Sequence, residues 1–278
     1  MQNSQLGISE SGFSDVAAIV TAMTHEERYC IEETVRAVAN DGAIAQLILC
    51  VESSNYWIEP ILSDWLVDSR IEIVRFSMAP PGAIRNQALA YVKLPWVAYC
   101  DGDDIWEPNK IAIQRQVAND TGADFVGADH YIANQAGVVC AFALARNLPV
   151  TSSWLVRTAV MKQYPFNNTL MIREDGDWWI RTHGKVSKVR CSRILLRYRV
   201  RLMSLSSGTR SKQRKIKITT LARYPIIKWI ILALTGLIWF AYRCRYYVWL
   251  KSWENEQSEA IKKMNLLNEP TTNISGKS

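Results

Sequence analysis

The sequence has little that would support a disulfide scaffold or a zinc site. Six cysteines are spread over 278 residues, and no two of them form a C-x-x-C pair. Cysteines used in this way are typical of reduced, buried thiols, so we expect a cytosolic compartment. The three histidines, at 25, 130 and 183, are too far apart to favour zinc. Residues 1–14 are polar and expected to be flexible, and without an apolar run or cleavage signature they do not predict secretion.

Acidic residues are missing from one long stretch. Between Trp178 and Trp253 there is no Asp or Glu, but there are 18 Lys and Arg. Residues 1–200 carry a net charge of −3, whereas residues 201–278 carry +10. A solvated basic surface usually contains interleaved acids, and this one does not. The pattern therefore predicts contact with an anion, such as lipid headgroups, nucleic acid or a diphosphate.

The sequence also lacks an apolar run long enough to be an obvious membrane span. Residues 229–242 are apolar over 14 positions, with basic and aromatic residues on both sides, and a spanning helix needs ~20. We expect 207–253 to form a basic, apolar helix lying in the cytoplasmic leaflet, followed by a polar tail over 254–278. A single span and a helix packed on the domain are the alternatives. Nucleic acid is not an expected partner, because no recognition-helix or RNA-binding motif is present.

Before this segment, apolar β-branched runs alternate with helical patterns. Such a β-α-β rhythm predicts an α/β fold with a mostly parallel sheet sandwiched by helices. Strands are predicted at 15–23, 46–51, 71–76, 94–100, 123–127, 152–157 and 195–199, helices after 24 and at 58–67, 82–94, 111–117 and 160–164, and a hairpin-like excursion at 129–139.

Three carboxylates follow the strand predicted at 94–100, namely Asp101, Asp103 and Asp104. They precede a turn and a helix, and the carboxyl ends of strands are where open α/β sheets bind ligands. Carboxylates this close disfavour one another's charged form, so a divalent cation such as Mg²⁺ or Mn²⁺ is a natural partner. A solvated acidic turn is the alternative interpretation of the same three residues.

This acidic segment resembles the family 2 glycosyltransferases of GT-A fold, in which a strand delivers a D-x-D-D-x-W-x-P-x-K pattern. The order of further motifs strengthens the resemblance. An arginine–asparagine helix start matches at 82–88, an E-D-x-D-x-W-x-R segment at 174–181, and a Y-R-x-x-x-x-S-x-S segment at 198–206. The acidic pattern itself is matched by Asp101, Asp103, Asp104, Trp106, Pro108 and Lys110.

The resemblance implies a GT-A, Rossmann-like domain over 15–206 that acts as an inverting glycosyltransferase. Its donor would be a nucleotide-diphosphate sugar, with a UDP-sugar expected, and its acceptor a hydroxyl of a glycan or lipid-linked sugar. Mn²⁺ or Mg²⁺ would be held by Asp103 with Asp101. The enzyme would work in the cytoplasm at the inner face of the plasma membrane, where the basic helix meets an anionic surface.

Site residues follow from the matched motif positions. The resemblance implies that Asp175 is the general base, with Glu174 and Asp177 as neighbours that tune or orient it, and Trp178 is a candidate for stacking on the acceptor sugar. One departure is that Glu52 and a serine stand where the family usually has two aspartates. The residues implied in nucleotide-sugar binding are Thr21, Glu26, Glu52, Arg85, Asn86, Asp101 and Arg199.

A second hypothesis is a non-catalytic, membrane-associated GT-A-like module that binds a nucleotide sugar or a glycan. Loss of either Asp103 or Asp175 would have favoured it. Both residues are present, so the sequence favours the enzyme.

Overall fold

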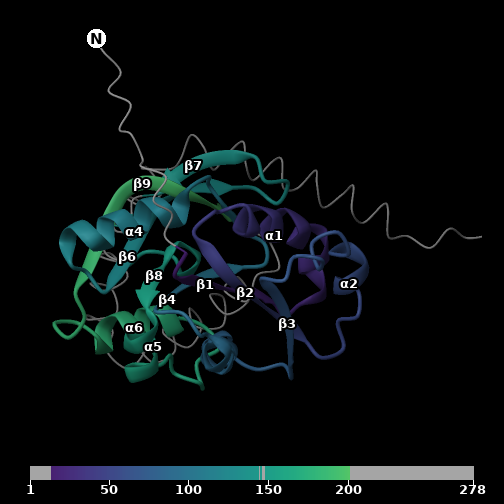
Figure 1. Cartoon of the computed structure of the whole chain (residues 1–278), viewed down its shortest axis with the longest axis horizontal. Helices are drawn as coiled ribbons and strands as arrows, with labels where there is room; N and C mark the ends of the chain where they lie inside the picture. The colour runs from purple at the N-terminus through teal and green to yellow at the C-terminus, as the bar shows by residue number, and fades with distance from the viewer. Residues whose placement is uncertain (1–13, 144, 146–147, 201–278) are drawn as a thin grey trace, which may run out of the picture. The chain divides into compact units, whose positions relative to one another are not determined.

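The computed structural model describes residues 14–143, 145 and 148–200 (Figure 1). The basic helix predicted at 207–253, the tail at 254–278 and the domain boundary at 206 lie outside the described residues. By contacts the chain divides into two units, one containing residues up to Ile132 together with Phe142–Arg199, and the other containing Ala133–Ala141 and Val200. The predicted site residues all belong to the first unit.

Within the described residues the strands form one nine-stranded sheet, in the order β3-β2-β1-β4-β8-β6-β9-β5, and β7 pairs with β6. The first four strands of this order are parallel, as predicted. The pairs β4–β8, β8–β6 and β9–β5 are antiparallel. The strands are β1 (Val16–Ala22), β2 (Ile44–Glu52), β3 (Ile71–Phe76), β4 (Trp96–Asp101), β5 (Ile105–Trp106), β6 (Phe125–Ala133), β7 (Val139–Ala143), β8 (Leu155–Arg157) and β9 (Lys188–Arg199).

The central strands are apolar throughout because both faces of the sheet are covered. Along β1, Val16, Ala18 and Val20 pack into one hydrophobic cluster, whereas Ala17 and Ile19 pack into a second cluster on the other face. All five side chains are fully buried. Successive side chains of a strand point to opposite faces, so a strand buried on both sides has no polar alternation.

Helices cover the two faces separately. Residues of α1, α2 and α4 belong to the first cluster, and residues of α3, α5 and α6 belong to the second. Figure 1 shows α1 and α4 on the opposite side of the sheet from α5 and α6. The helices are α1 (Ile31–Ala39), α2 (Ile58–Ile61), α3 (Pro81–Ala88), α4 (Lys110–Thr121), α5 (Thr158–Gln163) and α6 (Glu174–Arg181).

The helices expected after Thr24 and at 58–67 differ in type or in most of their length from the prediction. The helix expected after Thr24 starts as a 3₁₀ turn, His25–Tyr29. Its predicted capping box is confirmed, since the Thr24 backbone N–H donates to the Glu27 carboxylate and the Thr24 side chain accepts from the Glu27 backbone N–H. The helix predicted at 58–67 is only α2, and turns follow it. The segment after α2 contains Ser63, Asp64, Asp68 and Ser69, and side chains of these types compete with helical backbone hydrogen bonds.

The antiparallel half of the sheet was predicted less well. The strand expected at 152–157 is divided into a 3₁₀ turn, Thr151–Ser153, and the short strand β8. Strand β9 is far longer than the predicted 195–199. The predicted hairpin is present as β6 and β7, and in the second unit the Asn134 N–H donates to the Val138 carbonyl at 2.9 Å.

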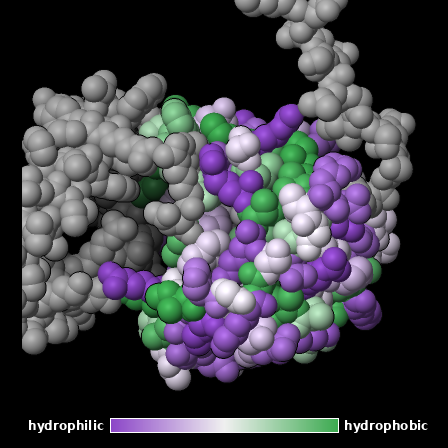
Figure 2. Space-filling model, turned by 90° about the vertical axis from the view of Figure 1, so that its left-hand side faces the viewer, coloured by the Kyte–Doolittle hydropathy of each residue, from purple (hydrophilic) through white to green (hydrophobic). Residues whose placement is uncertain are grey.

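The surface of the described part is mixed in character. Figure 2 shows hydrophilic and hydrophobic residues interspersed over the face that it draws. Among the described residues, no helix combines the length and the hydropathy needed to cross a bilayer.

Candidate functional site

The acidic turn lies beside the end of β1. Thr21 and Asp101 are register partners in the parallel pair β1–β4, and the Thr21 hydroxyl donates to Asp101 Oδ1 at 3.1 Å. The next residue, Gly102, donates its N–H to the Thr21 carbonyl at 2.8 Å. The carboxyl ends of the two strands therefore meet, and Asp101 lies at the end of β4, where the sequence analysis expected a ligand site.

Glycine is required at the centre of this turn by close packing. A Cβ on Gly102 would lie 2.7 Å from the Thr21 carbonyl oxygen and 3.2 Å from Glu27 Cγ. The Gly102 carbonyl accepts a hydrogen bond from the Thr34 hydroxyl at 3.1 Å. The turn is thus fixed to both β1 and α1.

Asp104 is the most buried acid of the turn, with no exposed surface. Its Oδ1 accepts the backbone N–H of Arg199 at 2.8 Å, while its Oδ2 has no hydrogen-bond partner. Burial raises the pKa of Asp104 well above its ordinary value, and repulsion by Asp103 and Asp101 raises it further. The uncharged form of Asp104 is therefore favoured, and the three carboxyl groups disfavour one another's charged forms.

These carboxylates fit a divalent cation shared with a phosphate ligand. Within the described part of the chain no three His, Cys, Asp or Glu side chains form a complete metal cage. Mg²⁺, however, usually takes one or two protein carboxylates and completes its shell with substrate phosphates and water. Asp103 is nearly buried and Asp101 keeps 36% of its side chain exposed, so the pair offers hard oxygen donors at an open edge.

Arg85 of α3 joins the acidic turn to α6. Its Nη2 lies 2.6 Å from Asp101 Oδ1, and its Nη1 lies 2.6 Å from Glu174 Oε1. The Arg85 side chain is only 4% exposed. Burial alone would lower the pKa of Arg85, but attraction to the two carboxylates outweighs it and raises the pKa. Arg85 is therefore a permanent cation between two acids that the sequence separates widely.

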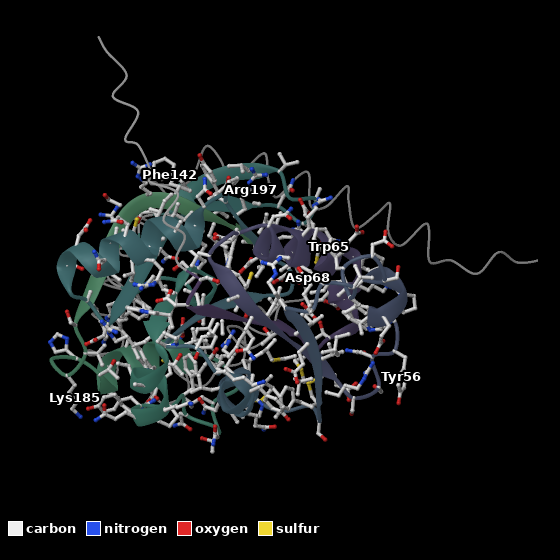
Figure 3. The ribbon with its side chains drawn as sticks, in the orientation of Figure 1. Tyr56, Trp65, Asp68, Phe142, Lys185 and Arg197 are labelled. Atoms are coloured by element: carbon white, nitrogen blue, oxygen red, sulfur yellow. The ribbon has the colours of Figure 1, made fainter. Side chains whose placement is uncertain are left out.

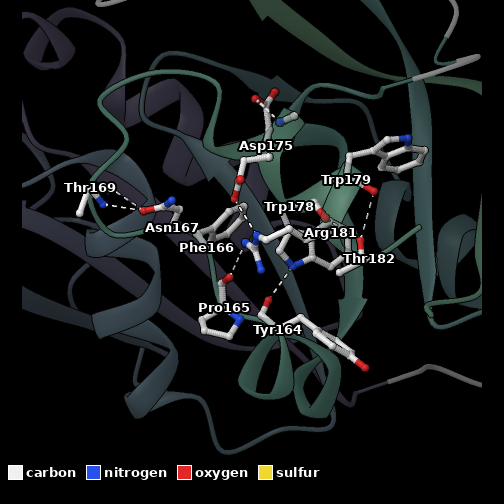
Figure 4. A network of polar contacts seen from close by, with 12 residues as sticks. Tyr164, Pro165, Phe166, Asn167, Thr169, Asp175, Trp178, Trp179, Arg181 and Thr182 are labelled. Carbon is white, nitrogen blue, oxygen red and sulfur yellow. Dashed lines mark hydrogen bonds and ion pairs between the residues drawn. The ribbon is translucent and has the colours of Figure 1, made fainter. Parts of the chain in front are cut away.

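The first turn of α6 carries three acids with different surroundings. Asp175 accepts the backbone N–H of Gly176 at 2.7 Å and is half-buried, and Figure 4 shows its carboxylate turned away from the Trp178 indole. Asp177 forms an ion pair with Arg181 at 2.7 Å. Glu174 forms an ion pair with Arg85. Each of the three neighbouring acids therefore has a different partner.

Trp178 does not have the position expected of an acceptor platform. It is fully buried, and its indole N–H donates to the Tyr164 carbonyl at 2.6 Å. Its ring centroid lies 5.0 Å from that of Trp154 and 5.7 Å from that of Phe125. The predicted stacking on a sugar is therefore wrong for this residue, because the ring is part of the hydrophobic core.

The other predicted nucleotide-binding residues lie outside the Thr21–Asp101–Arg85–Glu174 chain of contacts. Glu26 is exposed on the 3₁₀ turn. Glu52 is half-buried at the end of β2 and closes its own turn by accepting from the Ser53 hydroxyl at 2.8 Å, and hydrogen bonds from Ser54 and Ser53 lower the pKa of Glu52. Figure 3 labels Tyr56, which lies further along this turn at the periphery and is 72% exposed.

Asn86 and Arg199 make contacts of their own. The Asn86 amide donates to the Phe166 carbonyl at 2.8 Å and accepts the Phe166 N–H at 3.0 Å. The Arg199 guanidinium is buried and pairs with Glu33 of α1 at 2.9 Å. Their roles in donor binding stay predictions.

Sequence reasoning missed the contact of Ser152 with the acidic turn and the burial of Lys110. The Ser152 hydroxyl accepts the backbone N–H of Asp101 at 3.0 Å. Lys110 is fully buried, donates to Gln114 at 2.8 Å and lies 4.1 Å from the Trp106 ring centre. Ser and Lys are usually exposed, so neither residue type predicts burial. Lys110 was noted only as a matched motif position.

A pocket of about 240 Å³ lies between α1 and the segment that follows the acidic turn. It is lined by Glu33, Arg36, Asp41 and Ile105 among others, and none of the predicted site residues lines it.

Comparison with known proteins agrees with the family resemblance. A family model described as "Glycosyltransferase like family 2" matches residues 14–164. A curated relative from Escherichia coli, "UDP-Glc:alpha-D-GlcNAc-diphosphoundecaprenol beta-1,3-glucosyltransferase WfgD", is 28% identical over 154 residues. The match covers 51% of this chain and 60% of the relative, so the chain spans less than two thirds of that protein.

Solved structures show the same fold. TarS from S. aureus in complex with UDP-GlcNAc matches with a TM-score of 0.60 and 15% identity, over 69% of this chain and 61% of TarS. TarS in complex with UDP matches with a TM-score of 0.57 and 15% identity, over 68% of this chain and 61% of TarS. The α/β fold of GT-A type predicted from the sequence is thereby confirmed.

Proposed function

Because the chain belongs to the glycosyltransferase-like family 2, we propose that it transfers a sugar from a nucleotide-diphosphate sugar to a hydroxyl of an acceptor glycan. The observation that supports this most is the contact of Arg85 with both Asp101 and Glu174. This contact brings the acidic turn close to the first turn of α6. The acidic turn is suited to a donor diphosphate, and the first turn of α6 carries Asp175. A group-transfer site needs both parts together.

The donor side is assigned to the acidic turn. Asp103, with Asp101, is the proposed holder of Mg²⁺ or Mn²⁺, which would neutralise charge on the leaving diphosphate when bound. Thr21 fixes the Asp101 carboxylate by its hydrogen bond. The proposed donor is a UDP-sugar, since the E. coli relative is named as using UDP-Glc and TarS was solved with UDP-GlcNAc.

On the acceptor side, Asp175 is the proposed general base. It would accept the proton of the acceptor hydroxyl while that oxygen forms its bond to the anomeric carbon. The bond from that carbon to the diphosphate oxygen breaks, and the nucleoside diphosphate leaves from the opposite face. Attack opposite to the leaving group inverts the anomeric configuration. Asp175 is half-buried at the start of α6, so an acceptor can approach it from solvent.

The proposed acceptor is a sugar linked through diphosphate to a lipid. The E. coli relative is named for such an acceptor, an alpha-D-GlcNAc-diphosphoundecaprenol. A lipid-borne acceptor is presented at the membrane surface, so the enzyme would act at the cytoplasmic face of the membrane. The basic residues at 201–253, which lie outside the described part, would attract an anionic surface.

The donor half of the proposal is tested by calorimetry with the full chain. UDP-glucose, UDP-GlcNAc, UDP-galactose and GDP-mannose are titrated with and without Mn²⁺. The proposal predicts that one UDP-sugar binds and that Mn²⁺ tightens binding. Donor binding without any transfer to an N-acetylglucosamine-diphosphate lipid or other glycans would favour the non-catalytic module. Absence of binding by every donor would contradict the proposal.

A further inference from the structure

One face of α3 packs against the chain segment that precedes α6, at Phe166 and Asn167. Gly82, Arg85 and Asn86 are spaced three and four residues apart, so they lie on the same side of the helix. Asn86 forms two hydrogen bonds with the backbone of Phe166, one in each direction. A Cβ on Gly82 would lie 2.9 Å from Phe166 Cβ and 3.0 Å from the Asn167 carbonyl. The helix and the segment are therefore in direct contact.

Arg85 adds an electrostatic link to this contact. Its two terminal nitrogens go to two different carboxylates, Asp101 at the end of β4 and Glu174 in the first turn of α6. Glu174 is only 10% exposed. Removing one partner of a buried charge pair leaves an uncompensated charge, which is strongly unfavourable. The three groups therefore tend to stay together, and they fix the distance between the donor-side turn and α6.

We propose that Arg85 is a positioning residue that sets Asp175 relative to the donor, and that its main partners are carboxylates rather than the donor phosphates. This inference rests on the proposed function. Asp175 follows Glu174 directly, so holding Glu174 also holds the backbone of Asp175. A shift of about 1 Å in a reacting group can lower turnover by about 10²-fold. Weakening the bridge should therefore slow transfer and leave donor affinity nearly unchanged.

The bridge is tested by Arg85→Lys, which keeps the charge but loses the planar fork that reaches two carboxylates. The matched control is Arg115→Lys. Arg115 is also largely buried and pairs with one carboxylate, Asp15, from two nitrogens. Asp15 lies just before the amino end of β1, whereas Thr21 lies near its carboxyl end. The Arg115–Asp15 pair is therefore at the other end of the strand from the proposed site. A melting temperature measured for each variant confirms that it is folded.

In Arg85→Lys the remaining ammonium can still pair with Asp101, but it cannot reach both carboxylates. We therefore expect kcat to fall by about 10-fold or more while the Kd of the UDP-sugar, by calorimetry, stays within about 3-fold. Hydrogen–deuterium exchange should speed up in peptides covering 166–181, and Arg115→Lys should leave that exchange and kcat unchanged. Glu174→Gln should lower kcat in the same way. The double variant Arg85→Lys/Glu174→Gln should have a kcat only slightly lower than that of either single variant, because both substitutions break the same bridge.

Three results would overturn the inference. One is a rise in donor Kd of about 10-fold or more with kcat unchanged, which would mean that Arg85 contacts the donor phosphates directly. The second is unchanged exchange at 166–181. The third is a double variant whose fold-loss in kcat equals the product of the losses in the two single variants. Because exchange and donor binding need no acceptor, these readouts stand even if the parent shows no transfer, which would instead count against the proposed function.

Discussion

The Thr21 hydroxyl donates a hydrogen bond to the Asp101 carboxylate across the β1–β4 pair, at 3.1 Å. This contact joins the ends of two strands into one donor-side edge. A hydrogen bond to a charged group contributes roughly 1.5–3 kcal/mol. For Thr21→Val we therefore expect UDP-sugar affinity, measured by calorimetry with Mn²⁺, to fall by about 10-fold. Thr121→Val is the control, because that hydroxyl donates to the Val117 carbonyl at the end of α4. Unchanged donor affinity in Thr21→Val would remove Thr21 from the donor site.

Asp103→Asn tests the proposed metal site. The substitution keeps the size of the side chain but removes its charge and one of its hard oxygen donors. We expect donor binding to weaken and to lose its dependence on Mn²⁺, as seen in titrations with and without the ion. Asp120→Asn is the matched control, since Asp120 is exposed on α4 and pairs with Gln116. Binding of Asp103→Asn that responds to Mn²⁺ like that of the parent would contradict the site.

Trp178→Phe should lower stability without changing acceptor use. The indole is fully buried, and its N–H is satisfied by the Tyr164 carbonyl, so the variant loses volume and leaves that carbonyl without its partner. A loss of about 1–3 kcal/mol in the free energy of unfolding is expected from urea titration. Trp179→Phe, at a half-buried position, should lose less. An increase in acceptor KM with no loss of stability would restore Trp178 to the acceptor site.

Lys110 should make stability depend on pH. Burial lowers its pKa from 10.5 to about 7, so between pH 7 and 10.5 the unfolded chain binds a proton that the folded chain does not. Stability should therefore rise with pH in this window, by at most about 1.4 kcal/mol per pH unit. Lys110→Met lacks this group. The difference in unfolding free energy between parent and variant, from urea titrations at pH 7 to 9.5, should grow in favour of the parent. A constant difference would contradict the assignment.

The parallel half of the sheet was predictable because its signal is local. Strands such as β1, β2 and β4 are buried on both faces, so each appears as a continuous apolar run. The longer β9 was missed because its first half contains three basic residues, Lys188, Arg190 and Arg193, that are only partly buried or exposed. Such a stretch has neither an apolar run nor a clear period of two.

The site was predictable in its parts but not in its connections. The acids at 101–104 and 174–177 could be found from sequence motifs, and Arg85 from the helix start that precedes them. That Arg85 joins the two acidic segments could not be predicted, because Arg85 and Glu174 are 89 residues apart and meet only through tertiary packing. Burial of Trp178 likewise depends on neighbours from β6 and the segment before β8, such as Phe125 and Trp154.

Sugar transfer by the parent and by Asp175→Asn is the measurement that tests the central claim most directly. Labelled UDP-glucose and UDP-GlcNAc are each incubated with Mn²⁺ and an N-acetylglucosamine-diphosphate lipid, using the full chain. We predict that the parent forms a glycosylated lipid with inverted anomeric configuration, and that Asp175→Asn binds donor normally but is slower by about 10²–10⁴-fold. Equal transfer by Asp175→Asn, or a product with retained configuration, would contradict the account.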